Sequence, residues 1–127
     1  MPLRAACRSE LRAEASLRSG IKVVNEHRAA GNRPVTSVYL GLHIGEVFYG
    51  NIGSEDRLDF TVVGPAVNEA SRIAAMCRSV DRSVVVSSEF AAATPEPERA
   101  KLVSVGRYAL RGVGRAEELF TIDPRQE

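Results

Sequence analysis

An asparagine and an arginine, Asn68 and Arg72, stand four residues apart in the stretch VNEASR. On a helix this spacing places both side chains on one face, one turn apart. A guanidinium binds phosphate oxygens and stabilises charge that develops on them, and an amide can orient a ribose or phosphate oxygen. The pair is therefore a candidate for a nucleotide-binding site.

The elements around this pair favour anion binding. The preceding stretch DFTVV is typical of a strand, Gly64 of a sharp turn, and Pro65 of the first turn of a helix. Backbone N–H groups at a helix N-terminus already attract anions. Thr61, three residues before Gly64, ends the strand close to the helix start. A hydroxyl, an amide and a guanidinium are thus predicted to converge on one cleft.

The same spacing allows a plainer interpretation. Glu69 precedes Arg72 by three residues, and an ion pair at this spacing on a helix is common and weak. In that case Arg72 would pair with its neighbour and Asn68 would be a surface residue. Spacing alone favours this interpretation over a catalytic one.

The whole chain, residues 1–127, is expected to form a single domain of mixed α and β structure. Apolar residues that recur about every 3.6 residues predict helices, and β-branched residues that alternate with polar or small residues predict strands. Gly31 and Pro34 would end the first, long helix. The predicted elements are helices at 3–30 and 65–78, a helical turn at 88–93, an antiparallel strand pair within 35–50 and 58–63, and strands at 83–87, 102–110 and 118–122.

Each helix has a predicted apolar face. In the first helix it comprises Cys7, Leu11, Ala15, Leu17, Ile21 and Val24, and in the second Val67, Ala70, Ile73, Ala74 and Cys77. His43 lies inside a predicted strand with no metal-ligand set beside it. It is expected to be a packed residue and is assigned no functional role.

Bulk properties exclude several classes of protein. With 17 Lys and Arg against 16 Asp and Glu, the net charge of +1 gives no electrostatic case for binding nucleic acid or a membrane. The two cysteines lack CxxC spacing, which predicts neither a disulfide framework nor a zinc site and favours a reduced, cytoplasmic location. No apolar run is long enough to cross a bilayer, so no membrane segment is predicted.

A longer stretch carries a family resemblance. The string GLHIGEVFYGNIGSEDRLDFTVVGPAVNEASRIAAMC closely resembles the C-terminal half of the class III nucleotide cyclase catalytic domain, found in adenylate and guanylate cyclases. The shared pattern is His-x-Gly-Glu-Val, Gly-Asn-Ile-Gly, Arg-x-Asp-Phe-Thr-Val-x-Gly and Val-Asn-x-Ala-x-Arg, and YALRGVGRAEELF resembles the family's final loop between two strands. The resemblance implies an α+β, ferredoxin-like cyclase palm that lacks its N-terminal strand and metal-bearing hairpin.

The resemblance also implies roles by position. Asn68 resembles the asparagine that positions the ribose and the reacting phosphate, and Arg72 the arginine that neutralises charge in the transition state. Thr61 falls where adenine-selective members read the base. Arg111 falls where a basic residue, more usually Lys, contacts the terminal phosphates. The implied activity is that of an adenylate cyclase, a lyase that converts ATP to cyclic AMP and pyrophosphate in signal transduction.

The family's metal ligands have no counterpart in this chain. Class III cyclases hold two Mg²⁺ or Mn²⁺ ions through two aspartates in the N-terminal half of the domain, but the first aspartate here is Asp56. No metal-binding residue is therefore assigned, and Mg or Mn is expected only for the complete family domain. Without the two ions, in-line attack of the ribose 3′-oxygen lacks its main electrostatic support.

Three interpretations follow. Family members pair head to tail, so that one subunit gives the aspartates and the other the Asn and Arg, which predicts a homodimer or a heterodimer with another cyclase domain. The favoured interpretation is a fragment of an adenylate cyclase that is inactive as this chain alone. The second is a catalytically inactive cyclase-homology module that acts as a dimerisation or regulatory partner. The third, an unrelated α+β binding domain, would be excluded by strand–turn–helix geometry around Gly64.

Overall fold

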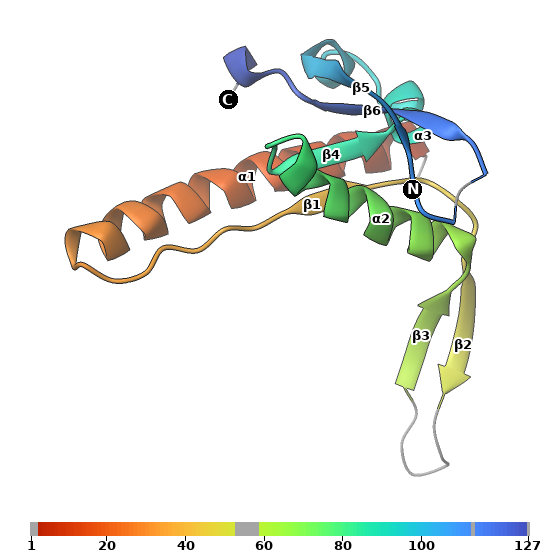
Figure 1. Cartoon of the computed structure of the whole chain (residues 1–127), viewed down its shortest axis with the longest axis horizontal. Coiled ribbons are helices and arrows are strands. Elements are labelled where there is room, and N and C mark those ends of the chain that lie inside the picture. Colours follow the sequence, from red (N-terminus) through yellow and green to blue (C-terminus); the bar gives the residue numbers. More distant parts are fainter. Residues whose placement is uncertain (1–2, 53–58, 113, 127) are drawn as a thin grey trace.

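Helix α1, Leu3–Ala30, runs along one side of the molecule and covers the range predicted for the first helix (Figure 1). The structure is a computed structural model that describes residues 3–52, 59–112 and 114–126, with the backbone alone at 51–52, 59–61 and 126. Only the first half of α1 is buried, through Cys7 and Leu11. The predicted apolar face was too long, because Leu17 and Val24 lie beyond the packing of α1 against α3 and β4 and are exposed.

The main sheet has four strands in the order β1-β4-β6-β5. Strand β1 pairs with β4 in parallel, and β6 pairs antiparallel with both β4 and β5. Helix α3 follows β4 directly and is capped by Ser87, whose Oγ accepts from the N–H of Phe90. The bounds are β1 Leu40–Leu42, β4 Val84–Ser87, α3 Ser88–Ala93, a 3-10 turn at Glu98–Lys101, β5 Leu102–Ala109, β6 Ala116–Ile122 and a final 3-10 turn at Pro124–Gln126.

Strand β4 is buried on both faces, which explains its unbroken Val84-Val85-Val86 run. Val84 and Val86 face α1 and α3, in a core that includes Cys7, Leu11 and Phe90. Val85 faces α2, Pro65–Ser79, in a second core with Ile73, Cys77, Leu110 and Leu119. The sheet therefore separates two cores, and α2 is the helix that covers the second.

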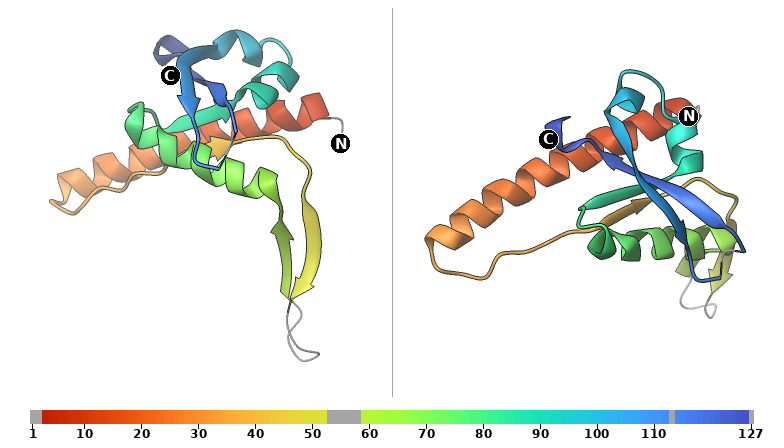
Figure 2. Two further views of the ribbon diagram at one scale, coloured as in Figure 1. Left: turned by 45° about the vertical axis from the view of Figure 1, so that its right-hand side comes forward. Right: turned by 45° about the horizontal axis from the view of Figure 1, so that its top comes forward.

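Strands β2, Phe48–Ile52, and β3, Asp59–Val63, form a separate two-stranded arm that extends away from the main sheet (Figures 1 and 2). Their predicted antiparallel pairing is confirmed, with Phe48 opposite Val63. The single strand expected over 35–50 was wrong, because the chain divides there between two sheets. Its short middle part, β1, joins the main sheet instead and pairs in parallel with β4.

A sharp turn joins β3 to α2. Gly64 has a φ of 139°, a conformation that residues with a side chain rarely adopt, and Pro65 begins the helix. Ile73 and Cys77 of α2 are fully buried as predicted, whereas Val67, which was also expected on the buried face, is 37% exposed. Strand, turn and helix therefore follow one another around Gly64 as the sequence predicted.

Helix α2 lies directly on the backbone of β1. A Cβ added at Gly41 would come within 2.5 Å of the backbone nitrogen of Ala74 and 2.8 Å of the carbonyl oxygen of Ala70. No side chain separates the helix from the strand at this point, so the position of α2 is set by contact between two backbones. Among the described residues, no helix is long and apolar enough to cross a membrane, and both cysteines are free.

Candidate functional site

A cleft of about 750 Å³ opens between the start of α2 and the turn that joins β5 to β6. Its size is in the range of small-molecule sites. Three of the four predicted site residues, Asn68, Arg72 and Arg111, line this one cleft. The complete lining comprises Pro65, Asn68, Glu69, Arg72, Glu89, Arg111, Gly112, Gly114, Arg115 and Glu117. A smaller hollow of about 310 Å³, between α1 and β1, is lined by none of the predicted site residues.

Asn68 and Arg72 occupy the first two turns of α2 and are exposed. The backbone N–H of Asn68 donates to the carbonyl oxygen of Gly64 at 3.3 Å, which ties the first turn to the preceding glycine. Their i, i+4 spacing places both side chains along the cleft. The positive end of the helix dipole points the same way, so backbone and side chains together favour an anion.

The ion pair between Glu69 and Arg72, the plainer interpretation of the sequence, does not form in the described part of the chain. Glu69 contacts His43 instead, with 3.0 Å between Glu69 Oε2 and His43 Nε2. The reason is the helical period: Glu69, Ile73 and Cys77 are spaced by four and face the sheet. Arg72 lies one position before Ile73, on the side of α2 that faces away from the sheet, and its side chain lines the cleft.

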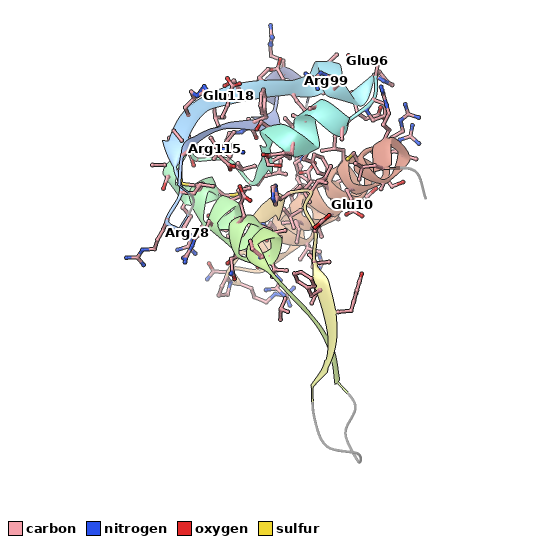
Figure 3. The ribbon with its side chains drawn as sticks, turned by 90° about the vertical axis from the view of Figure 1, so that its right-hand side faces the viewer. Glu10, Arg78, Glu96, Arg99, Arg115 and Glu118 are labelled. Atoms are coloured by element: carbon pink, nitrogen blue, oxygen red, sulfur yellow. The ribbon has the colours of Figure 1, made fainter. Side chains whose placement is uncertain are left out.

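The opposite wall of the cleft is the β5–β6 turn. Leu110, at the start of this turn, is buried in the second core, and Arg111 follows it with an exposed side chain. Gly112 has a φ of 82°, the left-handed conformation that glycine adopts without strain. Arg115, at the other end of the turn, lies between the strands and α2, with 3.8 Å between its Nη2 and Oε1 of Glu89 (Figure 3). The turn therefore contributes two guanidinium groups to the cleft.

Thr61, the predicted base-reading residue, lies on β3, where its backbone pairs with Gly50. Its side chain is outside the described part of the structure. Its proposed contact with the base therefore stays a prediction.

Sequence reasoning missed a group of carboxyls that line the cleft and a histidine that contacts one of them. His43, which had no assigned role, is buried with 5% of its side chain exposed. It lies 3.0 Å from Glu69, and its Nδ1 is 3.8 Å from Oε2 of Glu89. Glu117, on β6, lines the same cleft and is 5% exposed. Two sequence signals could have found the group: the four-residue spacing of Glu69 and Ile73, and the two-residue spacing of Glu117 and Leu119.

The carboxyl of Glu117 is a weaker acid than usual, because its pKa is raised. Burial raises the pKa of its carboxyl, and hydrogen bonding and repulsion from Glu69 and repulsion from Glu89 raise it further, while Arg115 lowers it. The net effect raises the pKa of Glu117 from 4.5 to about 7. Near neutral pH the cleft therefore carries less negative charge than the three glutamates that line it suggest.

The cleft does not offer a set of metal ligands. Within residues 3–52, 59–112 and 114–126, no three histidine, cysteine, aspartate or glutamate side chains are placed to hold one ion. Glu69 is engaged by His43, and Glu89 lies between His43 and Arg115. The Mg²⁺ or Mn²⁺ ions of the family therefore do not fit the side chains that this chain brings to the cleft.

Comparison with known proteins gives the same fold. The guanylyl cyclase Cya2 has a TM-score of 0.75 at 21% identity, over 94% of this chain and 58% of that one. A bacterial light-regulated adenylyl cyclase has a TM-score of 0.72 at 22% identity, over 92% of this chain and 33% of that one. The adenylyl cyclase CyaB from P. aeruginosa has a TM-score of 0.69 at 22% identity, over 86% and 54%. The predicted α+β cyclase fold is confirmed, and this chain covers part of it.

Similarity in sequence extends to mycobacterial proteins. An uncharacterised protein of Mycobacterium tuberculosis (strain ATCC 25618 / H37Rv) is 35% identical over 86 residues, which is 67% of this chain and 16% of that protein. A protein of Mycobacterium bovis matches equally well. The chain thus spans about a sixth of the length of these relatives.

Residues 9–123 match the family described as the adenylate and guanylate cyclase catalytic domain. The match includes α2, the cleft and most of both cores. The strand–turn–helix geometry around Gly64 agrees with it, so the third interpretation, an unrelated binding domain, is excluded. This chain belongs to the family of adenylate and guanylate cyclase catalytic domains.

Proposed function

We propose that this chain supplies the asparagine–arginine half of an adenylate cyclase site, which converts ATP to cyclic AMP and pyrophosphate. The observation that carries the proposal is the convergence of Asn68, Arg72 and Arg111 on one cleft from two separate elements. Family membership supports nucleotide cyclisation as the chemistry of this cleft. Adenine is the proposed base because Thr61 falls at the position where adenine-selective members read it.

In this proposal each side chain acts on a different part of ATP. Arg111, on the β5–β6 turn, binds the terminal phosphates, and the start of α2 adds its dipole. Asn68 orients the ribose and the reacting phosphate. Arg72 stabilises the negative charge that grows on the phosphoryl oxygens as the 3′-oxygen attacks and pyrophosphate leaves. Arg72 is free for this role because Glu69 is held by His43.

The other half of the site must come from a partner. This chain carries no counterpart of the family's aspartate pair, and no step of the reaction is assigned to a metal bound by its residues. We therefore propose that the chain is inactive alone and acts as a dimer with a cyclase domain that has the two aspartates. Robust metal-dependent synthesis of cyclic AMP by the purified chain alone would contradict this.

A complementation experiment tests the proposal. The partner is a related full-length cyclase that keeps its aspartates but has lost its own asparagine and arginine. Adding this chain should restore cyclic AMP synthesis, and Arg72→Ala should reduce the restored rate by about 10²–10³, mainly in kcat, since the guanidinium acts on charge that develops in the transition state.

The matched control is Arg78→Ala. Arg78 is also an exposed arginine of α2 (Figure 3). Its guanidinium lies over the ring of Tyr39, 5.3 Å from the ring centroid, and Arg78 is not among the residues that line the cleft. This control should restore synthesis as well as the unaltered chain. If the mixed dimer forms and Arg72→Ala is as active as Arg78→Ala, Arg72 has no catalytic role. A kcat/KM that favours GTP over ATP in the restored enzyme would refute the assignment of adenine.

One observation supports pairing, which both the half-site and the second interpretation, a module that regulates by pairing, require. The β2–β3 arm exposes Phe48 and Tyr49, which are 65% and 80% exposed. Large exposed apolar side chains are typical of interaction surfaces. A mixed dimer that forms and changes the activity of an intact partner, while Arg72→Ala has the same effect as the unaltered chain, would support a regulatory module instead of a half-site.

A further inference from the structure

Three carboxyl groups that line the cleft, those of Glu69, Glu89 and Glu117, come from three different elements. Two of them belong to surfaces that face each other. Ile73 of α2 and Leu119 of β6 pack together in the second core. One turn before Ile73 and two residues before Leu119, the same surfaces present Glu69 and Glu117. The apolar contact between helix and strand therefore continues at the cleft as a contact between two carboxyls.

The Glu117 carboxyl of this pair lacks a hydrogen-bond donor among the described residues. Glu117 is 5% exposed, and its buried Oε2 has no hydrogen-bond partner among the described residues. The Glu69 carboxyl lies within hydrogen-bonding reach of Glu117. Two ionised carboxylates offer only acceptors, so they cannot bond to each other, but one proton shared between them supplies the missing donor. The raised pKa of Glu117, about 7, is consistent with such a shared proton.

The charged neighbours of Glu117 do not supply this donor. His43 contacts Glu69, and Arg115 lies 3.8 Å from Glu89. Across β5, Tyr108 is in register with Glu117, but its hydroxyl donates to the carbonyl oxygen of Val105 at 2.7 Å. The other charged groups around the cleft and its β6 edge are Arg72, Arg107, Arg111 and Glu118.

We propose that the cleft takes up one proton together with a polyphosphate anion, and that Glu117 and Glu69 share this proton. A polyphosphate held by Arg72 and Arg111 adds negative charge beside the carboxyls, which favours their protonated form. By reciprocity the protonated pair binds the anion more tightly. The inference rests on the proposed function, because it places the phosphates of ATP in this cleft.

Calorimetry measures this uptake directly. Inorganic triphosphate is titrated into the chain near neutral pH, in two buffers with different enthalpies of ionisation, and the difference in heat gives the number of protons bound. The variants are Glu117→Gln, which keeps the shape but cannot ionise, and the control Glu118→Gln. Glu118 is the next residue of β6, and its carboxyl accepts from the hydroxyl of Ser104 at 2.9 Å, so it should not contribute to the uptake.

The unaltered chain and Glu118→Gln should take up more protons per triphosphate than Glu117→Gln, by up to about one proton. Protonation of triphosphate itself is common to all three chains and cancels in the comparison. Triphosphate affinity, relative to that of Glu117→Gln, should fall by up to about tenfold per pH unit above neutrality. Equal uptake in the three chains, or no binding of triphosphate to the unaltered chain, would overturn the inference.

A second measurement follows the proton without a ligand. In a ¹³C NMR titration, the carboxyl carbon of Glu117 should change its shift near pH 7, and Glu69→Gln should lower this midpoint because the repelling charge is removed. An ordinary midpoint for Glu117 would overturn the shared proton. Neither measurement depends on cyclic AMP synthesis, so the proposed function can fail in the complementation experiment while proton uptake is observed, and the reverse is equally distinguishable.

Discussion

The contact between α2 and the sheet has two halves of opposite character. The half near the end of the helix is apolar: Ile73 and Cys77 are fully buried against Val85 and Leu119. The half near the start of the helix is polar, and there Glu69 meets His43 and the carboxyl of Glu117. Both halves use the same helical period and the same strand alternation, so a single backbone arrangement positions them.

This difference separates stability from chemistry along one helix. Burial of apolar surface in the second half holds α2 to the sheet. In the first half, ionisation of the buried carboxyls costs free energy. In this half Asn68 and Arg72 line the cleft. Substitutions in the two halves should therefore affect different measurements, and the predictions that follow test this division from the largest effect to the smallest.

The largest effect on stability is expected from the apolar half. Ile73→Ala should lower the free energy of unfolding by about 2–5 kcal/mol, because it removes a fully buried side chain and leaves a cavity between α2 and β6. Denaturant titration followed by circular dichroism measures the change. Arg72→Ala, one residue earlier and exposed, should change stability by less than about 0.5 kcal/mol. Equal losses for the two variants would refute the division.

The next effect concerns the close contact under α2. Gly41→Ala should destabilise the chain by about 1–3 kcal/mol, because the new Cβ would overlap the backbone of α2 at Ala70 and Ala74. The same variant should weaken complementation, since displacement of α2 moves Asn68 and Arg72. Thermal unfolding and the restored cyclase rate measure the two effects. If stability falls while the rate is unchanged, the cleft does not depend on this contact.

The polar half should make stability depend on pH. The pKa of Glu117 is raised from 4.5 to about 7 in the folded chain, so the folded state binds this proton more tightly than the unfolded state. Its contribution to stability is fully present below pH 4.5 and is lost as the pH rises to about 7. Glu117→Gln should remove this loss, on the order of 1 kcal/mol, in denaturant titrations across that range. Glu118→Gln should leave it in place.

The smallest effect is expected at a glycine that lies outside the contact between α2 and the sheet. Gly20 lies inside α1, and a Cβ added there would have no neighbour within 4 Å. Gly20→Ala should therefore stabilise the chain by about 0.5–1 kcal/mol through helix propensity alone, measured by thermal unfolding. A destabilising Gly20→Ala would show that this part of α1 packs against something in solution.

Local patterns predicted most of the elements because helices and strands follow from neighbouring residues. The helical periodicity of apolar residues predicted α1 and α2, and Gly64-Pro65 predicted where α2 begins. The parallel pairing of β1 with β4 had no local signal, since Leu40 meets Val84 across more than forty residues of chain. The site divides in the same way. Three of its residues came from family motifs, whereas the contact of Glu69 with Glu117 depends on how α2 lies on β6.

The backbone contact at Gly41 also bears on how related sequences can vary. A larger residue there cannot be absorbed by a rotamer change, because the obstructing atoms belong to the main chain of α2. A substitution of Gly41 during evolution would therefore have to displace α2 as a whole, and Arg72, which lines the cleft, would move with it. Among diverged relatives, a side chain in place of Gly41 is therefore expected to accompany loss of the arginine for which we propose a catalytic role, which makes this glycine a marker for sorting active cyclase domains from degenerate copies.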